Sequence, residues 1–215
     1  MIKIENAEVM GWEAAIRGMR NPKNSWAKSD SFNTFIVDER TQEEKPFEHF
    51  IGPADLFLAS SLADAGPVHG KFMRMITVYL DITAPLYWWK EFDTYKVGTV
   101  ANSCSTMHKI HAKEFTLEDF SCDACPGFTN GVMETLEAWR KKYLETKDKK
   151  YWRAIIQLLP SSYNQRRTVM LNYEVLRNMY TYRKEHKLDE WREFCAWIET
   201  LPYSGLITGK ELSTE

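Results

Sequence analysis

Residues 99–106 (TVANSCST) form a run of small and polar side chains directly after Gly98. Pro85 and the aromatic residues that follow it predict a helix over residues 84–96, which this glycine ends. Exposed backbone N–H groups and hydroxyls next to a helix end can surround an anion or a base. The run therefore predicts a ligand-binding loop, and a plain structural turn is the alternative.

Two histidines and two cysteines form a second group with chemistry. His108 and His111 precede Cys122 and Cys125, and together they offer the four N and S ligands of a tetrahedral zinc site. A single C-x-x-C and a histidine pair at i, i+3 do not have the spacing of a zinc finger. We therefore predict no metal, with these four side chains as the only candidates. His108 is also the best acid or base by residue type.

Charge and composition exclude several classes of protein. The 215 residues carry 28 Lys and Arg against 30 Asp and Glu, which leaves a formal charge of −2 and no basic field for nucleic acid. The sequence has no apolar run of the ~18–20 residues that cross a bilayer, and no signal peptide. Four cysteines without a secretion signal indicate reduced thiols. We expect a cytoplasmic protein without a nucleic acid or membrane partner.

Hydrophobic periodicity and helix breakers predict the elements that position these residues. Residues 21–48 predict a long polar loop, residues 115–129 an irregular segment, and the chain after residue 202 a loose tail. Strands are predicted over residues 2–9, 72–82 and 166–171, and helices over residues 12–19, 53–65, 84–96, 131–146, 149–159, 173–184 and 188–200. The expected fold class is α/β (α+β), a single helix-rich domain over residues 1–215 around a small central sheet.

The order of these elements resembles the flavin-dependent thymidylate synthases, the ThyX family. In that family an Ala-Pro helix leads into the signature Arg-His-Arg-x-x-Ser-x-Asn-Glu-x-Ser-x-Arg. Here Ala84-Pro85 leads to Lys96, Thr99, Asn102 and Ser105, which keep the signature's chemistry when one extra residue is allowed before Asn102.

The signature is degenerate in this chain. Thr94 and Tyr95 stand where the family has its first Arg-His, Ser103 stands at the Glu, and Met107 stands at the last Arg. These departures indicate a changed substrate, a changed phosphate contact or a lost activity.

Segments on both sides of the signature support the resemblance. Residues 57–74 (FLASSLADAGPVHGKFMR) match the family's helix and its histidine-containing turn before a strand. Near the C-terminus, Leu159-Pro160, Arg166-Arg167, residues 178–183 and Trp191 match the family's Leu-Pro, Arg, Asn-x-x-x-x-Arg and Trp elements. The resemblance covers the chain from about residue 50 onward.

The resemblance implies a flavoprotein that carries out reductive one-carbon (methyl) transfer to a deoxyuridylate-like pyrimidine nucleotide. It implies FAD, a reduced nicotinamide cofactor, a folate one-carbon donor and a homotetramer with sites between subunits. It also implies roles for eight residues: Arg183 as the catalytic residue that orients the base, His69, Lys96, Thr99 and Asn102 at the cofactor, and Ser103, Ser105 and Arg166, with Arg183, at the substrate.

Three alternatives remain open from the residues alone. A non-catalytic ThyX-fold protein could bind a nucleotide or a protein partner through the same cleft. A zinc-stabilised protein of unrelated function is the second. The third concerns Arg183, which could be a surface cation in the last turn of a helix, where the helix dipole favours it.

Overall fold

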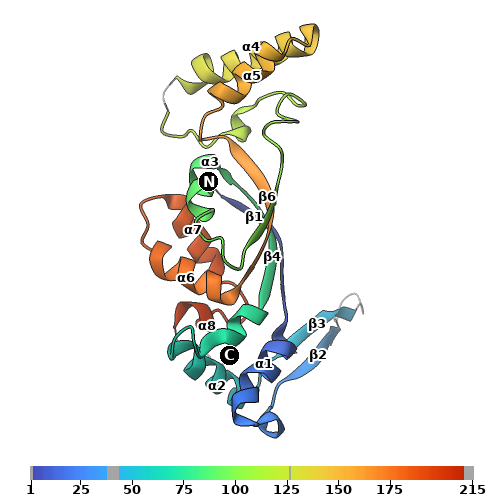
Figure 1. Ribbon diagram of the computed structural model, residues 1–215, viewed down its shortest axis with the longest axis vertical. Helices are drawn as coiled ribbons and strands as arrows, with labels where there is room; N and C mark the ends of the chain where they lie inside the picture. The colour runs from blue at the N-terminus through green and yellow to red at the C-terminus, as the bar shows by residue number, and fades with distance from the viewer. Residues whose placement is uncertain (1, 38–43, 126, 211–215) are drawn as a thin grey trace.

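The computed structural model describes residues 2–37, 44–125 and 127–210, and Figure 1 shows an elongated molecule with helices along one side of a small sheet. The sheet is antiparallel, with the strand order β1-β4-β6-β5. Its strands are β1 (Lys3–Met10), β4 (Thr77–Pro85), β6 (Asn164–Asn172) and β5 (Val100–Ser103). The predicted fold class, helix-rich around a small central sheet, is confirmed.

Burial alternates along the central strand β4, as expected for a sheet with one covered face. Val78, Leu80 and Ile82 are buried, whereas Tyr79 between them is exposed. The register pairs Leu80 with Val169 of β6, which is also fully buried. The buried face of the sheet is therefore one wall of the main hydrophobic core.

Three helices cover this buried face: α3 (Leu86–Phe92), α6 (Tyr173–Arg183) and α7 (Asp189–Ile198) (Figure 1). Trp88 of α3 is completely buried between them, and its ring centroid lies 4.9 Å from that of Trp89 and 4.9 Å from that of Trp191. Each such aromatic pair adds about 0.5–1.5 kcal/mol beyond the burial of its area. The aromatic residues that predicted helix α3 therefore hold it against the sheet.

The N-terminal part consists of short elements: α1 (Trp12–Arg20), the 3₁₀ turns η1 (Asn21–Lys23) and η2 (Trp26–Lys28), the strands β2 (Phe32–Val37) and β3 (Glu44–Phe50), and α2 (Pro53–Asp64). The prediction of a long loop over residues 21–48 is therefore wrong. β2 and β3 form a separate two-stranded sheet, with a register shift between Thr34 and Ile36. Phe32 and Phe50, which pair at the open end of this hairpin, are both exposed.

Three predicted segments differ from the elements in the structure. The strand predicted over residues 72–82 begins as the 3₁₀ helix η3 (Gly70–Met75), because the consecutive residues Phe72 and Met73 are both buried, as one side of a helical turn allows. The helix predicted over residues 84–96 begins at Leu86 and ends at Phe92, with Asp93 as its C-cap. The polar run after it contains the edge strand β5, whose residues are all exposed and therefore need no apolar pattern.

The chain after residue 202 is not loose within its described part. A short helix, α8 (Gly205–Thr208), buries Leu206 and Ile207 against the main core. The hydroxyl of Tyr203 accepts a hydrogen bond from the N–H of Ile51 at 2.8 Å. These two apolar residues hold the helix against the core, but two residues are too few to produce a periodic signal in the sequence.

A second, smaller core lies at the far end of the molecule, at the top of Figure 1. It is built from Phe115 and Phe120, which flank the 3₁₀ turn η4 (Leu117–Asp119), and from the π-helical turn η5 (Thr129–Met133), α4 (Glu134–Thr146) and α5 (Lys149–Leu158). Leu136 and Ile155, one from each long helix, are completely buried there. The Asp148 side chain caps α5 by accepting from the N–H of Lys150, and the helical predictions for this hairpin are confirmed.

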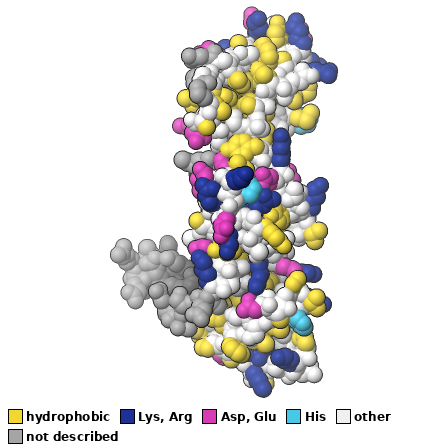
Figure 2. All heavy atoms as spheres, turned by 90° about the vertical axis from the view of Figure 1, so that its left-hand side faces the viewer, with side chains coloured by type: hydrophobic (Ala, Val, Ile, Leu, Met, Phe, Trp, Pro, Cys, Tyr) yellow, Lys and Arg dark blue, Asp and Glu magenta, His cyan; other side chains and the backbone are white. Residues whose placement is uncertain are grey.

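Charged side chains of both signs alternate along the face shown in Figure 2. This distribution follows from nearly equal numbers of basic and acidic residues. Among the described helices, none is long and apolar enough to cross a bilayer.

Candidate functional site

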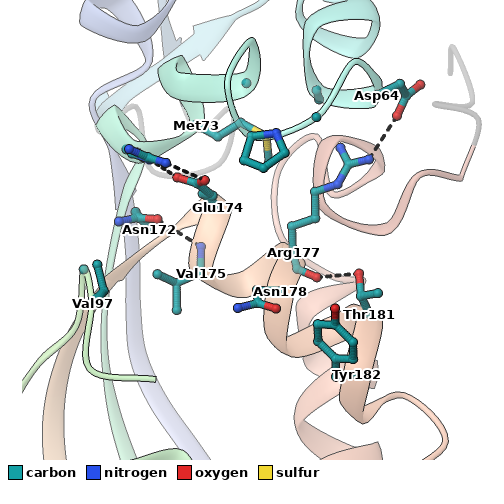
Figure 3. A pocket seen from close by; sticks show the side chains of 16 residues that line it. Asp64, Met73, Val97, Asn172, Glu174, Val175, Arg177, Asn178, Thr181 and Tyr182 are labelled. Atoms are coloured by element: carbon teal, nitrogen blue, oxygen red, sulfur yellow. Dashed lines mark hydrogen bonds and ion pairs between the residues drawn. The ribbon is translucent and has the colours of Figure 1, made fainter. Parts of the chain in front are cut away.

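A cavity of about 570 Å³ lies where four segments meet. The segments are the end of α2 with the turn after it, η3, the turn at Val97 and Gly98, and one side of α6 from its cap Asn172 to Tyr182 (Figure 3). Cavities of this size are typical of small-molecule sites. Because the lining comes from segments far apart in the sequence, no short sequence motif indicates this cavity.

The beginning of α6 is held in place by its cap. Asn172 accepts a hydrogen bond from the N–H of Val175 at 3.0 Å, which satisfies one free donor of the first helical turn. Gly98 packs against this cap with a φ of +81°, and a Cβ there would lie 2.8 Å from the Asn172 side-chain nitrogen. A glycine at this position therefore lets the turn approach the helix and close one side of the cavity.

Two ion pairs flank the cavity. The Arg74 guanidinium binds the Glu174 carboxylate through two hydrogen bonds, of which Nη2 to Oε1 measures 2.9 Å. Arg177 donates from Nη2 to Asp64 Oδ1 at 3.1 Å. Figure 3 shows the Glu174 carboxylate and the Arg177–Asp64 pair on opposite sides of the hollow. These four are the charged residues among the described lining, and their formal charges cancel.

The rest of the lining is apolar or neutral. Met73, Val97 and Val175 supply hydrocarbon surface, and Asn178 supplies an amide that both donates and accepts. Val97 is 91% exposed and Tyr182 is 74% exposed. Both side chains therefore leave the cavity open to solvent on their sides.

Comparison with known proteins identifies the fold. No protein-family model and no curated protein sequence matches the chain. A crystal structure of ThyX from Helicobacter pylori with FAD and dUMP matches with a TM-score of 0.72 and 14% identity, over 97% of this chain and 97% of that one. This chain has the ThyX fold. A second structure of the Helicobacter pylori flavin-dependent thymidylate synthase with FAD and dUMP matches with a TM-score of 0.71 and 14% identity, over 96% of this chain and 97% of the other.

In this ThyX fold, Arg183 does not line the cavity. Its Nη1 donates to Glu91 Oε2 at 2.5 Å, and its Nε donates to the Tyr95 hydroxyl at 2.9 Å. The guanidinium also lies 4.9 Å from the ring of Trp191. These contacts tie α6 to α3 and α7, and the ligand role of Arg183 stays a prediction.

The four predicted cofactor residues divide into two groups. His69 and Lys96 are exposed, and each directly precedes a residue that lines the cavity. Thr99 follows Gly98, but its hydroxyl donates to the backbone oxygen of Tyr95. Asn102 is on the edge strand β5, paired with Thr168, and does not line the cavity. His69 and Lys96 are therefore next to residues of the lining. Thr99 and Asn102 are not part of the lining.

The predicted substrate residues Ser103, Ser105 and Arg166 also lie outside the lining. Ser105 accepts from the N–H of His108 at 2.9 Å, within a local turn. Arg166 donates from Nη2 to Asp81 Oδ2 at 2.7 Å on the uncovered face of the sheet. Hydrogen bonds from Thr168, Arg166 and Asn6 hold the pKa of Asp81 well below its usual range. The ligand roles of these three residues stay predictions.

The candidate zinc ligands are not brought together. Among the described residues, no group of three or more His, Cys, Asp or Glu side chains has the arrangement of a metal site. The His111 ring packs edge-on against Tyr143, with centroids 4.8 Å apart. Burial raises the pKa of the Cys122 thiol, and Cys125 is exposed. His108, His111, Cys122 and Cys125 therefore do not form the tetrahedral site that their residue types allowed.

The sequence reasoning included Asn178 in the Asn-x-x-x-x-Arg element but missed the polar stripe of α6 to which it belongs. Glu174, Arg177, Asn178 and Thr181 follow each other at helical spacing and all line the cavity. A charged and amide-rich stripe next to an Asn cap was visible in the sequence. Its importance was not visible, because the ionic partners Arg74 and Asp64 are 100 and 113 residues away along the chain.

Proposed function

We propose that this protein binds a flavin, with FAD as the form, and a nucleotide-like pyrimidine ligand at the α6 cavity. The observation that carries the proposal is a cavity of ligand size in a ThyX fold, since the two similar structures both hold FAD and dUMP. The proposed activity is reductive one-carbon transfer to the pyrimidine, with a reduced nicotinamide cofactor and a folate as donors. The proposed assembly is a homotetramer.

The lining fits the flat, uncharged part of such ligands. Met73, Val97 and Val175 offer apolar surface to a ring system, and the Asn178 amide matches the donor and acceptor edge of a pyrimidine or a flavin. A bound flavin supplies the electron-transfer chemistry, and this chain supplies binding, orientation and exclusion of water.

The fit for phosphate groups is poorer within the lining itself. Arg74 and Arg177 are each bound to a carboxylate. We propose that the exposed residues His69 and Lys96, next to the cavity, serve the cofactor's phosphates, and that Arg183 orients the base after it leaves Glu91. Lysine binds phosphate as a point charge, with less directional control than arginine.

Flavin binding tests the proposal first. We expect the purified protein to show flavin absorption, or to acquire it when FAD or FMN is added. The Gly98→Ala variant should lose this property, because its Cβ would press against Asn172. Gly209→Ala is the matched control, since Gly209 also has a positive φ but open space around it. A colourless wild-type protein that takes up neither flavin would contradict the proposal.

A non-catalytic binding protein is the second candidate function. The observation in its favour is that the arginines of the cavity and of the predicted site, Arg74, Arg177, Arg166 and Arg183, are all engaged by carboxylates. Growth rescue of a thymidine-requiring bacterium distinguishes the two. Rescue supports the enzyme, whereas flavin or nucleoside binding without rescue supports the binding protein.

A further inference from the structure

The charge balance of the α6 cavity bears on which pyrimidine ligand it takes. Arg74 and Arg177 are the cations of the described lining, and Glu174 and Asp64 neutralise them. A phosphate that approached Arg74 would come within a few ångströms of the Glu174 carboxylate, because that carboxylate holds two of the guanidinium's donors. At about 5 Å the carboxylate repels the phosphate by roughly 1–3 kcal/mol, which offsets most of the attraction of Arg74, so the pair leaves the cost of removing the phosphate from water uncompensated.

The beginning of α6 does not compensate for this repulsion. A helix N-terminus attracts anions through its free N–H groups and its dipole. Here Asn172 already accepts from the N–H of Val175, and Glu174 places its own negative charge in the first turn. Asn172 and Glu174 therefore already interact with the positive end of this helix, and they reduce the attraction that it would exert on a ligand phosphate.

The neutral groups of the cavity remain available to a ligand. Asn178 is directed from α6 into the hollow in Figure 3, opposite Val97, and Met73 lies above both. An amide between apolar walls recognises an uncharged heterocycle, whose edge carries donors and acceptors and whose faces are apolar.

We propose that the cavity selects a pyrimidine nucleoside over its 5′-monophosphate, and that Glu174 is the residue that sets this selectivity. The inference rests on the proposed function, because it concerns the same cavity and the same ligand class. It narrows the ligand to the form without phosphate and assigns to Glu174 the exclusion of the charged form.

Calorimetric titration of the full chain with deoxyuridine and with dUMP, both with FAD present, tests the inference. We expect the wild type to bind deoxyuridine about tenfold more tightly than dUMP. In Glu174→Gln the Arg74 guanidinium loses its anionic partner, and affinity for dUMP should rise about tenfold while affinity for deoxyuridine stays within about twofold. Asp64→Asn is a second variant, which releases Arg177 and should act in the same direction.

Asp189→Asn is the matched control. Asp189 is also an acidic residue in the first turn of a helix and is also paired with an arginine, Arg192, but neither residue lines the cavity. It removes one negative charge and should change neither affinity.

The outcomes separate the inference from the proposed function. If the wild type binds dUMP as tightly as deoxyuridine or more tightly, the inference is overturned and the proposed function stands. If the preference is present but both Glu174→Gln and Asp64→Asn leave it unchanged, the role of Glu174 is overturned. If the wild type binds neither ligand and no flavin, both fall together.

Discussion

Two arginine–carboxylate pairs in this molecule have different surroundings. Arg20 and Asp55 join α1 to α2 inside the protein, where Asp55 is fully buried and Arg20 is 4% exposed. Arg74 and Glu174 meet at the rim of the α6 cavity, where the Arg74 side chain is 56% exposed. The first pair is enclosed by the fold, whereas the second is open to solvent and to a ligand.

The number of hydrogen bonds differs as well. The Asp55 carboxylate accepts from Arg20 Nε at 2.5 Å, from the hydroxyls of Ser29 and Ser31 at 2.7 Å, and from two backbone N–H groups at 3.1 Å. Glu174 is held by Arg74 at the cavity. A buried charge with this many donors holds segments together, and its loss leaves uncompensated charge. An exposed pair contributes about 0–1 kcal/mol and can change without loss of the fold.

The largest effect is expected for Asp55→Asn. Breaking a buried pair costs about 3–5 kcal/mol, because Arg20 keeps its charge without a counterion. Denaturant unfolding measures the loss. Asp64→Asn is the control, since the Asp64 side chain is 68% exposed and its removal should cost less than about 1 kcal/mol. Equal costs for the two variants would contradict the contrast between buried and exposed pairs.

The pH dependence of stability sharpens the same contrast. Burial alone would raise the pKa of Asp55, but hydrogen bonds from Ser29, Ser31 and Arg20 outweigh it and lower the pKa to about 2. The pKa of an aspartate in an unfolded chain is about 3.9. The stabilisation that the Asp55 carboxylate gives to the folded protein is therefore complete above that pH and is lost as the pH falls through about 2.

The expected loss from Asp55 is about 2–3 kcal/mol between roughly pH 5 and pH 1. Unfolding curves of wild type and Asp55→Asn across this range isolate it by difference. A wild type and a variant with parallel pH profiles would show that Asp55 does not titrate below its unfolded value.

Arg183→Gln tests a pair of intermediate exposure. Arg183 binds Glu91 and Tyr95. Hydrogen bonds to a charged group contribute about 1.5–3 kcal/mol each at most, so we expect the free energy of unfolding to fall by about 1–3 kcal/mol. Thermal unfolding measures it, with Arg192→Gln as an exposed arginine control. A decrease in deoxyuridine affinity larger than that of Glu91→Gln would give Arg183 the ligand role that the resemblance implies.

The smallest effect on stability is expected for Glu174→Gln. The Arg74–Glu174 pair is exposed and contributes little to stability. An acidic residue in the first turn of a helix adds about 0.3–1 kcal/mol. The free energy of unfolding of the variant should therefore fall by less than about 1 kcal/mol in unfolding measurements. A loss near that of Asp55→Asn would mean that Glu174 supports the fold rather than the choice of ligand.

Sequence reasoning predicted the central part of this fold well. Alternating residues around Leu80 and the aromatic residues of α3 have strong local patterns, because each buries one face against the same core. The order of elements also led to the ThyX family, and the structure has that fold. The hairpin of β2 and β3 and the short helix α8 were missed, and α8 was missed because a helix with two buried residues has no periodic signal.

The site was harder to predict than the fold. The family signature directed attention to residues 96–105, but in this chain most of that segment is an exposed edge strand and a turn. From that segment only Val97 and Gly98 line the cavity among the described residues, and Arg74, Glu174 and Asn178 line it from segments that only the tertiary structure brings together. Pairing of Arg74 with Glu174 across 100 residues depends on the packing of η3 against α6, which sequence spacing does not encode.

Hydrogen exchange of the wild-type protein with and without FAD and deoxyuridine tests the central claim most directly. If the α6 cavity is the ligand site and the Asp55 cluster is structural, exchange should slow at residues 97–99 and 172–178 when ligand binds, and should stay unchanged at residues 25–31. Protection confined to residues 25–31, or no protection around the cavity at saturating ligand, would contradict the account.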